Sequence, residues 1–191
     1  VGSRKVSIID DGTIRGLRGT HRYDDEGVRT GKNYLIKEGV LVGRLHSRET
    51  AYKMGEAPTG NARSIGYRHQ PIVRMTNTYI GKGDSSFQDM IKDVKLGLYA
   101  VDMVGGQTSM EMFTFSAACG YMIRDGEVAE LVRDVVLTGN VFKTLMNIDK
   151  VGDTISYPPA GGGCGKDEQS PLPVGFGGPH VRIQDVVVGG R

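Results

Sequence analysis

The chain has 191 residues, of which 38% are hydrophobic and 24% charged, and its formal net charge is +2. This balance is typical of a soluble globular protein of one domain or two small packed ones, and it makes nucleic-acid binding an unlikely function class. No apolar run approaches the length of about 18 residues that crosses a bilayer, so we expect no membrane segment. The two cysteines form no disulfide framework, which favours a reducing, cytoplasmic setting.

The chain contains short β-rich runs that end at turn residues. Residues 6–9 are apolar and are followed by the turn signal Asp10-Asp11-Gly12. Residues 34–42 read as two runs around Glu38-Gly39, and residues 121–128 repeat this pattern around Asp125-Gly126. Both stretches predict a β-hairpin, and their likeness hints at duplication of one hairpin unit.

Helical signals are fewer. The strongest is a set of apolar residues at three- and four-residue spacing that follows a capping-box-like Ser86. Its members are Phe87, Met90, Ile91, Val94 and Leu98. We expect one clear amphipathic helix over about residues 85–100, and short helices over residues 48–54 and 141–146. With further strands expected at 108–115 and 181–188, the predicted class is α+β with a mostly antiparallel β-sheet.

Residues 161–180, GGGCGKDEQSPLPVGFGGPH, surround a cysteine with glycines. Because glycine loses more backbone freedom on folding than other residues, we expect close backbone approach here and little contribution to the core. From this pattern alone Cys164 is equally well a structural thiol or a reactive or metal-binding one. Cys119 lies among small residues, and we expect it to be a buried core thiol.

Several common catalytic motifs are not found in the sequence. A phosphate-binding P-loop ending at Gly165-Lys166 would place Ala160 and Asp167 at its anchor positions, where glycine and Ser or Thr are needed. Gly175-Phe-Gly177 lacks the third glycine of a dinucleotide fingerprint, and no Gly-x-Ser-x-Gly elbow occurs. These observations argue against nucleotide binding and serine-hydrolase chemistry.

Metal binding is the remaining chemistry for a glycine-flanked cysteine. Zinc takes thiolate, imidazole or carboxylate ligands in tetrahedral geometry. The four histidines are His21, His46, His69 and His180, and no two are spaced to share one helix face. A two-histidine helical site is therefore absent from the sequence, although scattered histidines can still converge in space.

A series of short motifs carries a more specific signal. The motifs are IIDDGT (8–13), YDDEG (23–27), LIKEGVLVG (35–43), PTGNARS (58–64), RMTNTYI (74–80), KLGLYA (95–100), LTGN (137–140), CGK (164–166) and a late VGG. In their order and spacing they resemble, nearly end to end, the C-terminal part of the TldD/PmbA family. Its members were formerly called modulators of DNA gyrase and are now regarded as zinc metallopeptidases.

The resemblance implies a specific role for one residue. In the catalytic branch of the family, the cysteine of Cys-Gly-Lys is the third zinc ligand, and Cys164 matches that position. The other ligands and the general-base glutamate belong to a His-Glu-x-x-x-His helix, which this sequence lacks and which normally stands just upstream of its first residue. The resemblance thus implies a C-terminal domain, residues 1–191, of a TldD-like peptidase, which is inactive alone and binds zinc weakly or not at all.

Other residues receive weaker interpretations. Asp24, Asp25 and Glu26 form a turn with a solvated acidic face, or they orient a metal ligand from behind. Arg74 and Asn77 contact the substrate backbone or belong to a structural polar network.

The glycine-rich stretch also offers a place for substrate. Gly162 and Gly163 leave a strand edge on which an extended peptide pairs, and Lys166 and Gln169 are placed to polarise a carbonyl. The resemblance implies unfolded peptides as substrates and a related TldD/PmbA-type chain as partner in a homo- or heterodimer. The alternative function is a non-catalytic scaffold of that two-chain complex, and direct action on gyrase or DNA ranks last.

Overall fold

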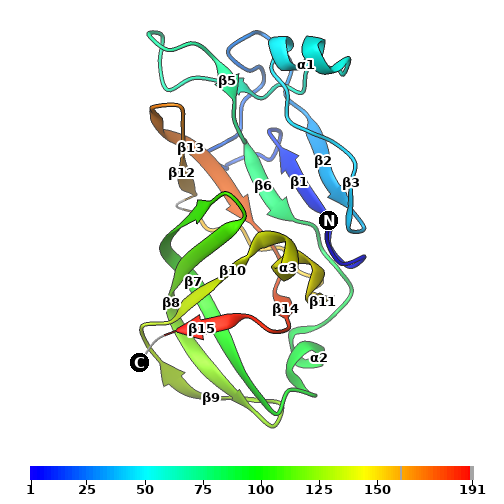
Figure 1. The fold of residues 1–191 in the computed structure, drawn as a ribbon, viewed down its shortest axis with the longest axis vertical. Coiled ribbons are helices and arrows are strands. Elements are labelled where there is room, and N and C mark those ends of the chain that lie inside the picture. Colours follow the sequence, from blue (N-terminus) through cyan, green and yellow to red (C-terminus); the bar gives the residue numbers. More distant parts are fainter. Residues whose placement is uncertain (160, 190–191) are drawn as a thin grey trace. The chain divides into compact units, whose positions relative to one another are not determined.

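The computed structural model describes residues 1–159 and 161–189 (Figure 1). They form two compact units. Unit 1 comprises residues 1–6, 83–153 and the chain from 180 onward, and unit 2 comprises residues 7–82 and 154–179. Each unit is therefore built from segments far apart in the sequence, and no single linker divides the chain.

Unit 2 contains a six-stranded sheet with the order β12-β13-β6-β1-β2-β3. Its strands are β1 (Ile8–Asp11), β2 (Lys32–Lys37), β3 (Val40–Leu41), β6 (Asn77–Ile80), β12 (Gly162–Lys166) and β13 (Gln169–Gly177). β13 and β6 pair in parallel, and the other neighbours are antiparallel. A separate two-stranded sheet joins β4 (Ala62–Arg63) to β5 (Ile72–Val73). β12 consequently forms one edge of the main sheet.

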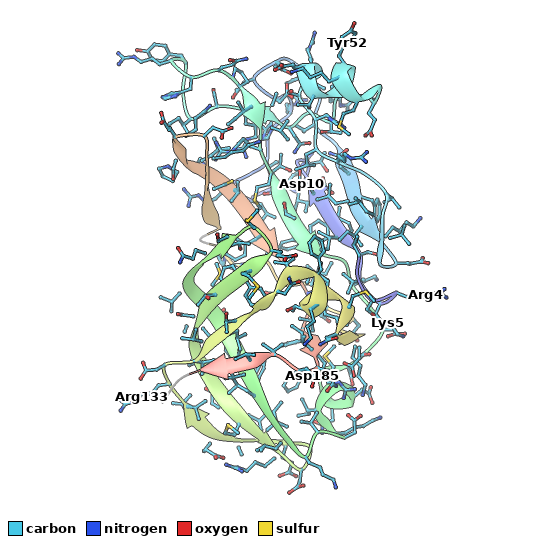
Figure 2. The ribbon with its side chains drawn as sticks, viewed as in Figure 1. Arg4, Lys5, Asp10, Tyr52, Arg133 and Asp185 are labelled. Carbon is cyan, nitrogen blue, oxygen red and sulfur yellow. The ribbon has the colours of Figure 1, made fainter. Side chains whose placement is uncertain are left out.

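The single helix of unit 2 has clear start and stop signals. α1 (Arg48–Met54) begins after Ser47, whose hydroxyl accepts a hydrogen bond from the backbone N–H of Thr50 in a capping box. It ends at Gly55, which has a left-handed φ of 66°. This confirms the predicted helix over residues 48–54. Tyr52 points outward from it and is 89% exposed (Figure 2).

Unit 1 is organised around a long antiparallel hairpin. β7 (Leu96–Ser109) pairs with β8 (Met112–Arg124), and the sheet continues through β10 (Val136–Asn140) to β15 (Val187–Gly189), while β9 (Glu127–Val132) also pairs with β8. β11 (Ile148–Val151) and β14 (Val181–Ile183) form a separate pair. The helices are α2 (Phe87–Ile91) and α3 (Val141–Met146), and α3 matches the prediction. The class is α+β and mostly antiparallel, as the sequence predicts.

The predicted helix over residues 85–100 is much shorter in the structure. α2 starts after Ser86, whose hydroxyl accepts from the N–H of Asp89, but it ends at Ile91, and β7 begins at Leu96. Four of the five spaced residues share a core without forming one continuous helix, because Phe87 and Val94 pack against a cluster of Met90, Ile91 and Ile123. The fifth, Leu98, lies in β7. Pairing with β8 overrides the helical periodicity after Lys92.

Two-residue turns close both predicted hairpins. Glu38 and Gly39 have φ of 49° and 78°, and Asp125 and Gly126 have φ of 47° and 83°. Positive φ at both central positions is the geometry that suits the twist of a hairpin. The two hairpins lie in different units, and the duplication suggested by their likeness stays a prediction.

Other expected strands have different limits. β1 starts at Ile8 and includes Asp10 and Asp11, which the sequence assigned to a turn. Residues 108–115 contain the end of β7, a turn at Met110 and the start of β8. Residues 181–188 form two strands separated at Asp185, whose φ is 56°. Among the described residues, no helix is long and apolar enough to cross a membrane.

Two expectations about burial are wrong. The stretch 161–180 does contribute to the core, because Leu172 and Val174 are each 3% exposed and Gln169 is 5% exposed. Its residues alternate along β13, so the apolar ones face inward while the prolines and glycines lie between them. Cys119 is only half-buried, because it lies in β8, a strand whose residues are mostly part-exposed.

Candidate functional site

The Cys164 hairpin, defined as β12, the turn Asp167-Glu168 and β13, carries the predicted ligand. Cys164 lies opposite Leu172, and Gly163 lies opposite Pro173. The thiol is free and half-buried. Asp167 and Glu168 both have positive φ, 48° and 63°, so this turn has hairpin geometry without any glycine.

Pro173 of β13 determines which backbone groups of β12 face outward. Pro173 has no N–H, so it cannot exchange the paired hydrogen bonds of an antiparallel ladder with Gly163. The N–H and C=O of Gly163 are therefore directed away from β13, toward the open edge. The Pro173 carbonyl accordingly faces the other way and accepts a hydrogen bond of 2.9 Å from Nη2 of Arg63. β12 is thus an edge strand on which Gly163 directs its backbone groups outward, and the pairing of a peptide at Gly162 and Gly163 stays a prediction.

Three side chains tie the Cys164 hairpin to the β4–β5 sheet and its connecting loop. Nη2 of Arg74 donates to the carbonyl oxygen of Cys164 over 2.5 Å, and Nζ of Lys166 donates to the carbonyl of Val73 over 3.2 Å. The buried amide of Gln169 accepts from the N–H of Ile65 and donates to the carbonyl of Gln70. Lys166 and Gln169 thus hold a neighbouring hairpin, and both the oxygen and the nitrogen of the Gln169 amide take part in doing so.

The guanidinium of Arg63 lies close to this hairpin as well. Its Nη1 donates to the carbonyl of Met75 over 2.7 Å, in addition to the bond to Pro173. Burial lowers the pKa of Arg63, the nearby carboxylates of Asp25 and Asp10 act in the opposite direction, and the charge of Arg74 lowers it further. Two positive charges therefore lie near the Cys164 hairpin.

The acidic turn at residues 24–26 bonds to backbone amides. Asp24 is buried, and its carboxylate accepts from the N–H groups of Glu26, Val28 and Ala62 over 2.8–3.0 Å. Asp25 accepts from the N–H of Ser64, and Glu26 accepts from the N–H of Arg48, each over 2.7 Å. These carboxylates organise the loops of unit 2, and the solvated acidic face expected from the sequence does not form at Asp24.

A buried polar network around Asp10 was not anticipated from the sequence. Asp10 is fully buried on β1, as labelled in Figure 2, and its carboxylate accepts four hydrogen bonds. The donors are the N–H and hydroxyl of Thr76, the hydroxyl of Thr78 and Nδ2 of Asn61, at 2.7–2.8 Å. Asn61 also donates to the carbonyl of Arg74 over 3.0 Å, so the network fixes the backbone of the residue that holds Cys164.

Asn77 belongs to a polar network, the second of its two interpretations. It is fully buried, its Oδ1 accepts from the N–H of Gly19 over 3.0 Å, and its Nδ2 donates to the carbonyl of Asp11 over 2.7 Å. Its side-chain amide therefore links β6 to the loop after β1. It is not available to contact a substrate backbone.

An open cavity of about 280 Å³ lies beside the Cys164 hairpin. Its lining includes Leu172 and Pro173, the residues opposite Cys164 and Gly163, together with His21 and Arg63. Nδ1 of His21 lies 2.8 Å from the carbonyl oxygen of Gly19, its Nε2 is buried, and the ring also interacts with the backbone of Gly60. Burial, assisted by the charge of Arg63, lowers the pKa of His21, which favours the neutral ring.

Two of the other histidines have hydrogen-bond partners of their own. His46 is buried and bonds through Nε2 to Glu56 over 2.9 Å, and His180 in unit 1 bonds to the hydroxyl of Tyr99. Within residues 1–159 and 161–189, no group of three or more His, Cys, Asp or Glu side chains could hold a metal ion. Cys164 could supply one sulfur ligand to a zinc ion. The described residues do not bring together enough further ligands for a complete zinc site.

Comparison with known proteins identifies the family of this chain. The family model of the PmbA/TldA metallopeptidase C-terminal domain matches residues 1–190. The chain belongs to this family. The resemblance to TldD/PmbA proteins that the motifs carry is thereby confirmed.

Individual relatives agree with this PmbA/TldA assignment. Metalloprotease slr0863 of Synechocystis sp. is 53% identical over 189 residues, which cover 99% of this chain and 41% of that protein. A zinc metalloprotease TldD homolog of Saccharolobus solfataricus is 35% identical, over 88% of this chain and 38% of that protein. The crystal structure of TldE from Thermococcus kodakarensis has the same fold, with a TM-score of 0.78 at 22% identity, over 99% of this chain and 40% of that one. The chain spans about two fifths of the length of these relatives.

Proposed function

We propose that this chain is the C-terminal part of a zinc-dependent peptidase and that Cys164 supplies one of the zinc ligands. The observation that carries the proposal is the free thiol of Cys164 on the edge strand β12, next to a backbone edge open to a peptide. The names of the relatives, metalloprotease and zinc metalloprotease, support the same chemistry. The two free thiols suit a reducing, cytoplasmic compartment.

The other ligands would come from outside these residues. Because the described chain has no three-residue donor group, two histidines and a general-base glutamate belong, in this proposal, to the remaining three fifths of the full-length protein. Zinc bound there would polarise a peptide carbonyl and lower the pKa of a bound water. The 191-residue chain alone would then bind zinc weakly and would not hydrolyse peptides.

The residues of this chain would hold and orient an extended, unfolded peptide. The outward-facing N–H and C=O of Gly163 can pair with a peptide main chain. The missing side chains of Gly162 and Gly163 leave space that Phe176 and Pro171 of β13 occupy. Lys166 is exposed on the same strand and keeps N–H donors beyond the one that bonds Val73, so it can reach a substrate carbonyl. Gln169 and the acidic residues 24–26 would act indirectly, by fixing the loops around Cys164.

A second candidate function is a non-catalytic assembly domain that contacts a related TldD/PmbA-type chain. The five-stranded sheet of unit 1 favours it, because large apolar side chains on that sheet are exposed. The most exposed of them are Leu96, Val104, Leu131 and Val187, at 62–74%. A non-catalytic assembly domain needs no metal at Cys164, and this separates it from the peptidase role.

Zinc content distinguishes the two functions. Elemental analysis would compare the longest natural polypeptide containing this sequence with its Cys164→Ser and Cys119→Ser variants. We expect about one zinc per chain in the parent protein and in Cys119→Ser, and a large loss in Cys164→Ser. Full zinc retention by Cys164→Ser would refute the ligand role and leave the assembly function.

A further inference from the structure

Arg74 is a buried charge with few hydrogen bonds. The residue is 2% exposed, yet Nε and Nη1 of its guanidinium have no partner among the described residues. Its Nη2 donates over 2.5 Å to the carbonyl oxygen of Cys164, a residue 90 positions away in the sequence. The best-defined contact of this buried guanidinium is therefore with the backbone of the proposed zinc ligand.

Stability does not explain this arrangement. Removing a guanidinium from water carries a large desolvation penalty, which is recovered only when its N–H groups are all well bonded. Arg74 also lies near the like charge of Arg63. A methionine of similar volume would fill the same space without these costs, so we infer that the charge is present for another reason.

The geometry connects Arg74 to a firmly held backbone. Its N–H donates to the carbonyl of Asn61 over 2.8 Å, and Nδ2 of Asn61 donates both to the carbonyl of Arg74 and to the buried carboxylate of Asp10. Cys164, by contrast, lies between two glycines on an edge strand, and the pairing is irregular between Cys164 and Lys166. The hydrogen bond from Arg74 thus joins a buried hydrogen-bond network to a glycine-flanked residue beside an irregularity in the strand pairing.

We propose that Arg74 is a positioning residue that fixes the Cys164 backbone so that the thiol is presented to zinc in one orientation. This inference rests on the proposed function of Cys164 as a zinc ligand. Partners that orient a ligand from behind commonly change metal affinity by about 10- to 100-fold when they are removed. A purely structural arginine would instead change stability and metal binding together.

The test uses the full-length protein with the variants Arg74→Met, Arg74→Lys and Arg182→Met. Arg182→Met is the control, because it removes a guanidinium that bonds to Asp149, Asp93 and the carbonyl of Met90, all in unit 1. Zinc affinity would be measured by competition with a chelator, cobalt substitution would report the thiolate-to-metal absorption band, and thermal unfolding would report stability. No peptidase assay is needed.

We expect Arg74→Met to weaken zinc binding about 10- to 100-fold and to shift the cobalt band, while its melting temperature stays close to that of the parent. Arg74→Lys should recover part of the affinity, and Arg182→Met should leave the cobalt band unchanged. Unchanged zinc affinity and an unchanged band in Arg74→Met would overturn the positioning role. If Cys164→Ser itself keeps its zinc, the proposed function fails first, and the two failures are thereby distinguished.

Discussion

Asp10 and Thr76 lie 66 residues apart in the sequence and are joined by two hydrogen bonds, from the N–H of Thr76 at 2.8 Å and from its hydroxyl at 2.7 Å. This pair connects β1 to Thr76, the residue before β6. Asn61 bonds to the same Asp10 carboxylate and to the carbonyl of Arg74, so the network also fixes the backbone of Arg74. The buried carboxylate acts only as an acceptor here. The Asp10 network therefore links the interior of the sheet to the Cys164 hairpin.

Replacing Asp10 by Asn should destabilise the protein by about 3 kcal/mol, because one acceptor oxygen becomes an NH2 group that faces donors. Urea unfolding would measure the loss of free energy of unfolding. Hydrogen exchange of the folded protein would show whether protection falls in β1 and β6. Asp125→Asn is the control, since Asp125 is an exposed turn residue with left-handed φ, a conformation that Asn also adopts. Equal stability of the two variants would contradict the role of the Asp10 network.

The sequence predicts a helix or a hairpin turn correctly where neighbouring residues determine it. The α1 helix has its cap residues Ser47 and Gly55 within the sequence window, and the hairpin turns at Gly39 and Gly126 carry the expected glycine. The turn at Asp167-Glu168 has no glycine and was missed. Contacts between residues far apart in the chain, such as those of Asp10 and Arg74, have no local signature at all.

The close approach of Gly19 to β6 gives a second prediction. A Cβ atom at Gly19 would lie 2.1 Å from the carbonyl oxygen of Thr76, and a backbone oxygen cannot move aside as a side chain can. Gly19→Ala should therefore lower the free energy of unfolding by about 2–3 kcal/mol. At Gly31 an added Cβ has no atom within 4 Å, so Gly31→Ala should be nearly neutral. Thermal melts of both variants test this difference, and similar melting temperatures would refute it.

The lowered pKa of His21 predicts a dependence of stability on pH. Burial and the charge of Arg63 disfavour the protonated ring in the folded state, so the unfolded chain binds a proton more readily. Stability should then fall as the pH drops through the ordinary histidine value of 6.5 and toward the lowered folded-state pKa. Denaturant unfolding would measure the free energy of unfolding at a series of pH values below 6.5. In His21→Gln this free energy should change less steeply with pH than in the parent protein. His69→Gln, at an exposed position, should keep the slope of the parent protein.

In unit 1, the contact between Arg182 and Asp149 leads to a prediction about the pKa of Asp149. The hydrogen bond from Arg182 holds the pKa of Asp149 below its ordinary value of 3.8, so the pair contributes stability that is lost as the pH falls through the lowered pKa. Arg182→Met should raise the pKa of Asp149 toward its ordinary value, which carboxyl NMR titration would detect. The pKa of Glu130, which is about 2 because of its bond to Arg124, should not change in that variant. A shift at both carboxyl groups would indicate a general disturbance of unit 1.

Main-chain pairing at β12 predicts a two-residue periodicity in peptide recognition. Because only alternate residues of an edge strand direct N–H and C=O groups outward, only every second residue of a bound peptide pairs with it. Peptides of one sequence, N-methylated at either odd or even positions, would be compared by fluorescence anisotropy against the full-length protein treated with chelator to prevent cleavage. One set should bind at least about 10-fold more weakly, since each lost bond leaves a backbone acceptor unpaired. Equal weakening by both sets would show that substrate side chains, and not the edge at Gly163, determine binding.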